Sequence, residues 1–429
     1  MTETLLVVLE DAVAGTLSRL RGGRLEFEYD EQYRARARAT PLSLSMPIRD
    51  ASHPDRVVGP WLSGLLPDNE AVLARWARHF HVSARSPFAL LSTPVGEDCA
   101  GSVRFVAPEE ISRVLARTGE VTWLTDEEVG GRLRELREDA TAWLGESFTG
   151  QFSLAGAQAK TALLFKDGRW GAPAGATPTT HILKPAVAGL DDHDLNEHLC
   201  LEAARRAGLL VARSKVARFG EEIAVVVTRY DRLLDGDIKR VHQEDVCQAL
   251  GVPPDRKYQS EGGPGVGNVS KLLWEAMPPG VADEAVWRFA DALIWNWLIA
   301  GTDAHAKNYS LLLAGDQIRL APLYDIASAL PYGAHERKLR FAMKIGGDYL
   351  VYPQRNPWPA AAREMGLERE ALLARVLALA RVAPDAFADA SKSPEVRTLK
   401  RDLPARLLDL LADRIGRCIK VVDGSGPSA

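Results

Sequence analysis

Residues 301–308 carry the side chains whose types and spacing say most about chemistry in this sequence. Asp303 is followed five positions later by Asn308, and a further carboxylate, Asp325, comes shortly after. In phosphoryl-transfer enzymes an aspartate at this spacing accepts or orients the proton of the attacking hydroxyl, while the asparagine holds Mg²⁺ on the phosphates. A later aspartate also binds the metal. The pattern therefore predicts a phosphoryl-transfer site, with Asp303 as catalytic base and Asn308 and Asp325 as metal ligands.

The elements expected around this site divide the chain into a β-rich part and a helical part. Residues 289–300 are apolar on most faces and predict a buried helix directly before the polar run. Strand signals occur up to about residue 235, whereas helical patterns dominate from residue 242 to about 422. A small β-rich lobe followed by a helical lobe is the order of a bilobal, protein-kinase-like fold of the α+β class.

Three domains are expected, and a length of 429 residues fits that number. Residues 1–112 would form an N-terminal β-rich subdomain, which carries no catalytic motif and is therefore assigned an interaction or regulatory role. Residues 113–235 would form the kinase N-lobe. Residues 236–429 would form the helical C-lobe with the catalytic and metal-binding loops.

A loop of small residues, 153–161, precedes two predicted strands. Gly156 would let backbone N–H groups approach phosphate oxygens closely. The segment does not match the P-loop pattern, because Ala159 stands where that pattern needs glycine before Lys-Thr. An ordinary turn is the alternative, but the position before two strands and a lysine favours a nucleotide loop. The nucleotide-contacting residues predicted here are Ala155, Gly156, Ala157, Gln158 and Lys160.

Lys184 ends a short predicted strand and is followed by Pro185. A lysine fixed on a strand behind a phosphate-binding loop suits the α- and β-phosphates, which are bound well by a point charge. A surface lysine at a strand end is the alternative. Glu197 and Glu202 on the next helix are candidates to pair with it, and Glu197 is preferred because it lies near the helix start.

Two histidine-containing runs are ambiguous. His305 and Lys307 are counted among the nucleotide-contacting candidates, although His305 also suits a structural role, and magnesium prefers oxygen ligands to imidazole. Two interpretations of residues 242–245 remain open: Asp245 is the N-cap of a helix, or the segment is part of a nucleotide site. Residues 261–267 are rich in glycine and predict a loop between helices.

Composition limits the partners and the compartment. Apolar content of 46% and charged content of 26% are typical of a globular protein. The net charge of −4 lacks the overall positive charge that is typical of nucleic-acid-binding proteins. The four scattered cysteines favour reduced thiols. The N-terminus has acids where a signal peptide needs lysine or arginine, and no apolar run reaches the roughly 18 residues of a membrane span. We expect a cytoplasmic protein without membrane contact.

Taken in order, these segments resemble the HipA family of bacterial toxin kinases, the kinase components of HipBA-type toxin–antitoxin modules. The co-linear resemblance covers about residues 152–347, and the first hundred residues resemble the N-terminal subdomain of the family. The matching segments are residues 153–164, 180–185, 196–197, 229–232, 242–250, 301–308 and 320–326.

The resemblance implies a serine/threonine protein kinase that uses ATP and Mg²⁺. Lys184 would then bind the phosphates. Ser153 matches the serine that family members autophosphorylate to switch themselves off. Residues 223–228 predict a β-branched strand, and the chain leaving it would be the hinge beside adenine. This strand exit comprises Thr228, Arg229, Tyr230 and Asp231.

The resemblance also implies partners. The antitoxin would be a HipB-like helix-turn-helix protein that binds operator DNA, so that DNA contact is mainly through the antitoxin. The substrate would be a translation-related protein, which in the best-known member is glutamyl-tRNA synthetase. Members differ in their targets, and the target itself does not carry over.

Two alternative functions remain open. The Asp-x-His-x-x-Asn pattern also resembles lipid and small-molecule kinases of the phosphatidylinositol type, and the chain has no His-Arg-Asp or Asp-Phe-Gly. A non-catalytic module that binds the antitoxin is the third hypothesis. The intact set of Asp303, Asn308, Asp325 and Lys184 counts against that third hypothesis.

Overall fold

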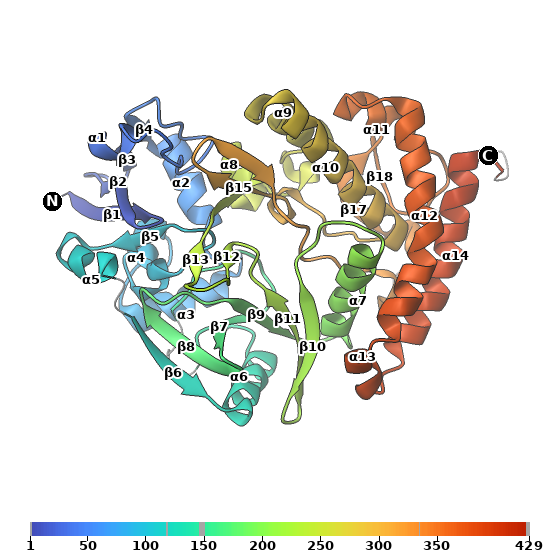
Figure 1. Cartoon of the computed structure of the whole chain (residues 1–429), viewed down its shortest axis with the longest axis horizontal. Helices are drawn as coiled ribbons and strands as arrows, with labels where there is room; N and C mark the ends of the chain where they lie inside the picture. The colour runs from blue at the N-terminus through green and yellow to red at the C-terminus, as the bar shows by residue number, and fades with distance from the viewer. Residues whose placement is uncertain (1, 117–118, 146–150, 334, 426–429) are drawn as a thin grey trace. The chain divides into compact units, whose positions relative to one another are not determined.

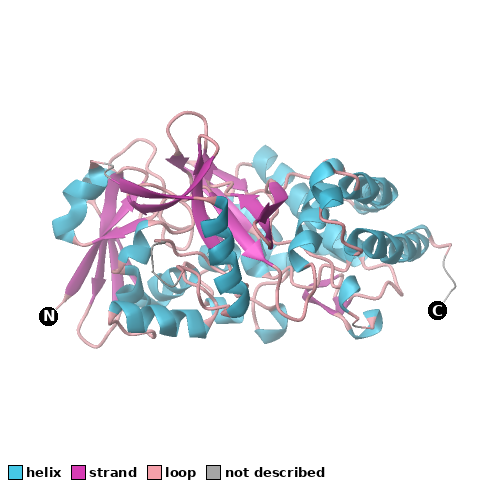
Figure 2. Cartoon of the chain, turned by 90° about the horizontal axis from the view of Figure 1, so that it is seen from below, coloured by secondary structure: helices cyan, strands magenta, loops and turns pink. Residues whose placement is uncertain are grey.

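The computed structural model describes residues 2–116, 119–145, 151–333 and 335–425. These residues form two compact units, each built from separate stretches of chain. Unit 1 comprises Met1–Pro185, Arg218–Asp255 and Ser310–Ile318, and unit 2 comprises Ala186–Ala217, Arg256–Tyr309 and Arg319–Ala429. Most strands belong to unit 1 and most long helices to unit 2 (Figure 1; Figure 2). The expected α+β class is confirmed. The boundaries expected at residues 112 and 235 stay a prediction.

The chain begins with a five-stranded sheet of unit 1, in the order β4-β3-β2-β1-β5. Along β3, Leu25, Phe27 and Tyr29 are buried and alternate with outward glutamates, as the sequence pattern predicts for a half-buried strand. Helices α2, α3 and α4 supply further core residues, and the side chains of Asn69 and Ser86 cap the N-termini of α3 and α4. The elements are β1 (Glu3–Leu9), β2 (Ala12–Arg19), β3 (Leu25–Tyr29), α1 (Glu31–Arg34), β4 (Ser52–Pro54), α2 (Asp55–Gly64), α3 (Glu70–Phe80), α4 (Pro87–Leu91), β5 (Arg104–Val106) and α5 (Ile111–Leu115).

A second sheet of six strands has the order β10-β11-β9-β7-β8-β6. The β7–β8 hairpin turns at Asp167 and Gly168, both with positive φ, a conformation that the Asp-Gly pair favours. Helix α6 lies against β9 and β11 and opens with a capping box of Thr125 and Glu128, which a Thr followed three residues later by Glu favours. The elements are β6 (Gly119–Leu124), α6 (Asp126–Glu138), β7 (Thr161–Lys166), β8 (Arg169–Gly175), β9 (His181–Pro185), β10 (Ser214–Phe219) and β11 (Glu222–Thr228).

Short strands also occur after residue 242, where helical patterns were expected to dominate. They form a three-stranded sheet, β14-β15-β16, and a separate β17–β18 hairpin. The longest of them, β15 and β17, are no shorter than β3, but they lack its alternation of apolar and polar residues. A short apolar run cannot be told from a helical segment by periodicity, which is why these strands were missed. The elements are β12 (Arg232–Leu233), β13 (Lys239–Arg240), β14 (His242–Asp245), α8 (Val246–Ala249), β15 (Ser310–Ala314), β16 (Gln317–Leu320), β17 (Arg340–Ile345) and β18 (Asp348–Leu350).

Unit 2 is mainly helical, and its centre is α10, in which every residue from 292 to 299 is buried. The expected buried helix before the polar run is therefore confirmed. Helix α12 packs on α7, α10 and α14. Across the described residues, no helix is both long enough and apolar enough to span a bilayer. The helices are α7 (His193–Arg206), α9 (Val266–Ala276), α10 (Pro279–Ile299), α11 (Trp358–Met365), α12 (Arg369–Ser391), α13 (Pro394–Thr398) and α14 (Leu403–Asp423).

Residues 242–250 dock onto the N-terminal part of unit 1 through buried polar groups. His242 Nε2 donates to the Leu42 carbonyl at 2.9 Å. The Glu244 carboxyl group accepts from the Leu44 N–H at 2.8 Å and from a serine hydroxyl, that of Ser43. Because both side chains are buried, these bonds replace water that the groups have lost.

The same segment answers the question left open for Asp245. Its side chain accepts from the Gln248 N–H at 2.9 Å, and the Gln248 side chain accepts from the Asp245 N–H at 3.0 Å. This is a capping box at the start of α8. Asp245 is therefore a helix N-cap.

Burial makes the stability of unit 1 depend on pH through Glu244. Burial raises the pKa of Glu244 to about 8, although its bonds to Ser43 and Leu44 oppose the shift. The folded chain keeps this proton up to about pH 8, while an unfolded chain loses it near the ordinary glutamate value. Stability should therefore fall as pH rises, by up to about 1.4 kcal/mol per pH unit.

We expect Glu244→Gln, an isostere of the protonated acid, to reduce the loss of stability between pH 6.5 and 8. His242, whose pKa burial lowers to about 4, is present in both proteins, so its contribution to the pH dependence cancels in the comparison. Thermal unfolding of wild type and Glu244→Gln at the two pH values measures the difference. Equal pH slopes for the two proteins would contradict the prediction.

Candidate active site

The polar run predicted to be catalytic starts where α10 ends. Ala300 adopts a left-handed conformation with φ of 55°, and the Gly301 N–H donates to the Asn296 carbonyl at 2.8 Å. A Cβ atom on Gly301 would lie 2.2 Å from Asn296 Oδ1, so any larger residue would have to displace the Asn296 side chain. The chain therefore turns sharply out of a buried helix and leaves Asp303 exposed in the following loop.

Asp303 is held by side chains on both sides of the loop. The Tyr258 hydroxyl donates to Asp303 Oδ1 at 2.7 Å. The Asn308 amide, through Nδ2, donates to the Asp303 carbonyl at 2.8 Å, and the His305 N–H donates to the same carbonyl at 2.8 Å. Two of the predicted residues, Asp303 and Asn308, are thus brought into direct contact. Tyr258 was missed, because it lies 45 residues upstream and belongs to no recognised motif.

His305 and Lys307 are buried beneath this loop. The His305 ring meets the Tyr258 ring edge-to-face, with centroids 5.0 Å apart. The Lys307 carbonyl accepts from the Tyr324 hydroxyl at 2.6 Å. His305 therefore supports the loop and its tyrosine, and nucleotide contact by these two residues remains a prediction.

Asn308 and Asp325 line the same small cavity, together with Asn296, Ala304 and Tyr324 among others. Its volume of about 10 Å³ is close to the space of one water molecule. Asp325 is exposed, and its φ of 56° puts it in the left-handed region, which aspartate tolerates better than most residues. Strained backbone of this kind is common at functional sites.

Hydrogen bonds tie the segment after Asp325 to the end of α10. The Ser328 hydroxyl donates to the Ile299 carbonyl at 2.6 Å, and the Ala329 N–H donates to the Ala300 carbonyl at 3.1 Å. Asn196 on α7 bonds both the carbonyl and the N–H of Ser328, at 2.8 and 3.2 Å. These hydrogen bonds therefore hold the loop that carries Asp325 in a defined position next to the loop that carries Asp303.

Asn196 thus has a structural role that the sequence did not reveal. Its neighbour Glu197, the preferred partner for Lys184, is also buried on α7.

The donor set in unit 2 fits a magnesium ion. Asn308 donates through Nδ2 to the main-chain carbonyl of Asp303, so the Oδ1 atom of Asn308 lies on the other side of its amide group. Asp325 supplies an exposed carboxylate. In the described ranges, no group of three or more His, Cys, Asp or Glu residues is placed to hold a metal. Magnesium needs no such group, since it takes one or two protein oxygens and completes its shell with phosphate and water.

The loop predicted to contact phosphates lies in unit 1 and is held at its start. Ser153 is fully buried; its hydroxyl donates to the Leu65 carbonyl at 2.9 Å, and its N–H donates to the Asp98 carbonyl at 3.0 Å. The Gly156 carbonyl accepts from the Asp68 N–H at 3.1 Å. Gly156 has a φ of 104°, which only glycine adopts without strain.

The two predicted lysines of unit 1 are both buried. Lys160 Nζ donates to the Ala155 carbonyl at 2.6 Å and lies 4.8 Å from the centre of the Trp143 ring. Lys184 lies on β9, where its neighbour on β11 is Val225. Of the other predicted loop residues, Ala157 is exposed and Gln158 is half-buried.

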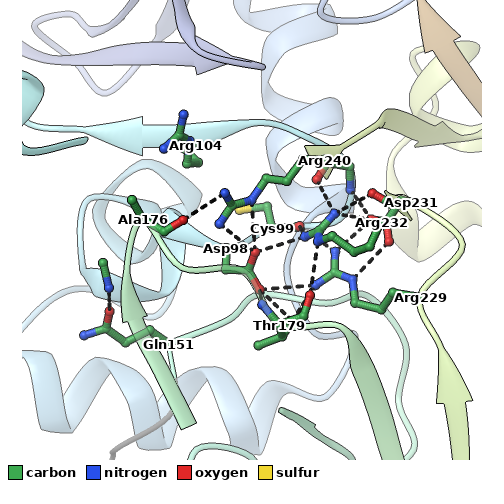
Figure 3. Close-up of polar contacts among 12 residues, drawn as sticks. Asp98, Cys99, Arg104, Gln151, Ala176, Thr179, Arg229, Asp231, Arg232 and Arg240 are labelled. Atoms are coloured by element: carbon green, nitrogen blue, oxygen red, sulfur yellow. Dashed lines mark hydrogen bonds and ion pairs between the residues drawn. The ribbon is translucent and has the colours of Figure 1, made fainter. Parts of the chain in front are cut away.

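At the strand exit expected to lie beside adenine, two side chains form buried ion pairs. Arg229 and Asp231 are buried and pair with each other at 2.7 Å, within a larger cluster of ion pairs (Figure 3). The Tyr230 hydroxyl bonds to the Gln243 side chain, and Thr228 ends β11. A base bound here would not be contacted by the Arg229 and Asp231 side chains, because both are committed to the protein interior.

Comparison with known proteins matches most of the chain. Residues 5–106 match the HipA N-terminal domain, and residues 152–387 match the HipA-like C-terminal domain. The putative kinase Y4mE of Sinorhizobium fredii is 35% identical over 372 residues, which cover 86% of this chain and 87% of that protein. The serine/threonine-protein kinase toxin HipA of Shewanella oneidensis is 28% identical over 368 residues, which cover 81% and 80%.

A solved structure, that of Shewanella oneidensis HipA with HipB and its operator DNA, matches with a TM-score of 0.82. The sequence identity is 25%, and the match covers 98% of both chains. Fold and matches together define a HipA-like kinase of the α+β class. The chain belongs to the HipA family of serine/threonine kinase toxins, which confirms the resemblance seen in the sequence. The roles of the individual site residues remain predictions.

Proposed function

We propose that this chain is an ATP-dependent serine/threonine protein kinase that acts in the cytoplasm as the toxin of a type II toxin–antitoxin module. One observation carries the proposal within a chain of this family. The exposed Asp303 is hydrogen-bonded to Asn308, and Asn308 lines a small cavity together with Asp325. This combination of base and metal ligands is what phosphoryl transfer to a hydroxyl needs.

In this proposal Asp303 accepts the proton of the attacking serine or threonine hydroxyl. Tyr258 binds one carboxylate oxygen of Asp303, which limits its rotation and leaves the other oxygen for the substrate. Asn308 and Asp325 would hold Mg²⁺, which when bound neutralises charge on the phosphates. Lys184, and Lys160 after it releases the Ala155 carbonyl, would supply positive charge to the phosphates.

The proposed partners are a HipB-like helix-turn-helix antitoxin and a translation-related protein substrate. The match to HipA solved with HipB and operator DNA over 98% of the chain supports the antitoxin. A net charge of −4 supports DNA contact that is mainly through the antitoxin. For the substrate, an aminoacyl-tRNA synthetase such as glutamyl-tRNA synthetase is the class to test first. The expected outcome of its phosphorylation is growth arrest and persistence.

A phosphotransfer assay with protein, lipid and aminoglycoside acceptors tests the proposed function. We expect transfer from ATP to protein serine or threonine, and growth arrest on expression that a co-expressed HipB-like antitoxin relieves. Transfer to lipid or aminoglycoside alone would establish the small-molecule kinase instead. Antitoxin binding without transfer to any acceptor would establish the non-catalytic module.

Ser153 is the proposed site of self-inactivation. Its hydroxyl is fully buried against the Leu65 carbonyl, so the loop must leave this position before a phosphate can be added. A phosphate carries about −1.5 to −2 charges at neutral pH and cannot return to a buried site of that size. We expect wild type to carry one phosphate and to bind ATP poorly once modified, as measured by intact mass and by ATP titration.

Ser153→Asp and Ser153→Ala separate regulation from local stability. We expect Ser153→Asp to lose ATP affinity and growth arrest well beyond Ser153→Ala, which loses only the bond to Leu65 at a cost of about 1 kcal/mol. Self-inactivation at this residue is wrong if the phosphorylated protein binds ATP normally, or if active wild type never acquires the phosphate.

A further inference from the structure

Asp98 is a fully buried carboxylate on which five polar groups converge (Figure 3). Its Oδ1 accepts from Arg232 Nη2 at 2.9 Å and from Arg240 Nη2 at 3.2 Å. Its Oδ2 accepts from Arg229 Nη1 at 3.3 Å and from the hydroxyl and N–H of Thr179 at 2.6 and 3.1 Å. Both oxygens are thus committed to groups of the protein itself.

These contacts join the two parts of the chain that match the HipA N-terminal and C-terminal domains. Asp98 belongs to the N-terminal domain, residues 5–106, whereas its partners belong to the C-terminal domain, residues 152–387. The junction is reinforced by Asp231, which accepts from the Gly101 N–H at 2.7 Å, and by the Cys99 carbonyl, which accepts from Arg229 at 2.8 Å. Residues 98–101 therefore hold the strand exit after β11, residues 228–231, in place through these hydrogen bonds and ion pairs.

The main chain of the same segment also holds the start of the predicted phosphate loop. The Asp98 carbonyl accepts from the Ser153 N–H at 3.0 Å, and Cys99 forms a parallel bridge with Ser153. One residue thus contacts both segments of unit 1 that are expected to bind ATP. Its carbonyl oxygen contacts the loop, and its carboxylate contacts the strand exit.

The electrostatics of the cluster make this contact rigid. Burial opposes ionisation of Asp98, but the charges of Arg232, Arg229 and Arg240 outweigh it and hold the pKa of the carboxyl below its ordinary value. An ionised carboxylate without access to water has no alternative partners, so the arginines keep a single arrangement. An amide in its place would have no charge, and would offer one acceptor oxygen where two are used.

We propose that Asp98 is a positioning residue for nucleotide binding, because it sets the distance between the Ser153 loop and the strand exit at residues 228–231. The inference rests on the proposed kinase function. It gives the N-terminal domain a part in the ATP-binding geometry as well as in partner contacts. The alternative is that Asp98 only holds the two domains together.

The test compares Asp98→Asn with Glu222→Gln. Glu222 is a buried acid of the same unit that pairs with Arg134 and Arg137, and in the described residues its side chain forms no hydrogen bond or ion pair with residues 153–161 or 228–231. Binding of a non-hydrolysable ATP analogue with Mg²⁺, thermal unfolding, and hydrogen exchange of residues 151–160 are measured on the full chain. The analogue prevents autophosphorylation during the titration.

We expect Asp98→Asn to weaken analogue binding by about tenfold or more, a usual size for coupling between sites, and to speed exchange at the Ser153 amide. Glu222→Gln should lose stability without either change. Equal analogue affinity for Asp98→Asn and wild type would overturn the inference alone. Failure of wild type to bind the analogue would overturn the proposed function, and the inference with it.

A milder variant keeps the test decisive if Asp98→Asn does not fold. Thr179→Val removes one hydrogen bond to Asp98 and one acceptor of Arg229, while the arginine–aspartate pairs stay in place. We expect a loss of analogue affinity of a few fold, with faster exchange at Ser153. Unchanged affinity and exchange in a folded Thr179→Val protein would overturn the inference.

Discussion

Asp303→Asn is expected to lower phosphotransfer by at least about 10²-fold while ATP still binds. The amide has the size of the carboxyl group and can still accept the Tyr258 hydrogen bond, so the loop should keep its conformation. It cannot take a proton from a substrate hydroxyl at neutral pH. Single-turnover phosphotransfer and ATP titration separate the loss of chemistry from a loss of binding.

Tyr258→Phe is the matched control for this prediction. It removes the hydrogen bond to Asp303 Oδ1 and keeps the base and the ring contact with His305. We expect a smaller loss than for Asp303→Asn, because the carboxylate remains but is less well oriented. Near-normal turnover in Asp303→Asn would rule out the catalytic assignment of this residue.

Replacement of Asp325 should have the second large effect. Asp325 supplies the carboxylate at the small cavity that Asn308 also lines, so its loss removes the charged ligand proposed for Mg²⁺. We expect Asp325→Ala to lower phosphotransfer at least about a hundredfold and to weaken ATP binding in the presence of Mg²⁺. Titrations with and without Mg²⁺ measure this directly.

The backbone of Asp325 provides a control that distinguishes metal binding from strain. Its φ of 56° suits glycine and costs alanine about 1 kcal/mol. Asp325→Gly should therefore be more stable to heat than Asp325→Ala, yet equally inactive. If the glycine variant kept both activity and Mg²⁺-dependent ATP binding, the metal assignment would be wrong.

Several parts of the fold could be predicted because they depend on neighbours in the chain. The capping box of Thr125 and Glu128 and the Asp167–Gly168 turn are local hydrogen-bonding or dihedral preferences. The contact between Asp303 and Asn308 is of the same kind, since five residues of loop bring them together. The family too could be recognised from such short runs, taken in order.

The contacts that support those residues could not be predicted, because their partners are far apart in the chain. Tyr258 meets Asp303 across 45 residues, and Arg229 meets Asp98 across 131. Such pairs depend on how helices and strands pack, and no local pattern marks them. For the same reason the sequence did not reveal that the side chains of Arg229 and Asp231 form buried ion pairs, and the place of these residues beside a nucleotide stays a prediction.

By itself, therefore, the sequence determined the class of chemistry, the family and the residues proposed to carry it, since these depend on residue types at short spacing. Tertiary structure alone decided which side chains are exposed to act. It leaves Asp303 and Asp325 at the surface and buries Ser153 against the Leu65 carbonyl. The physical reason is that burial is a property of packed elements, and a serine in a loop of small residues looks the same in sequence whether it is covered or open.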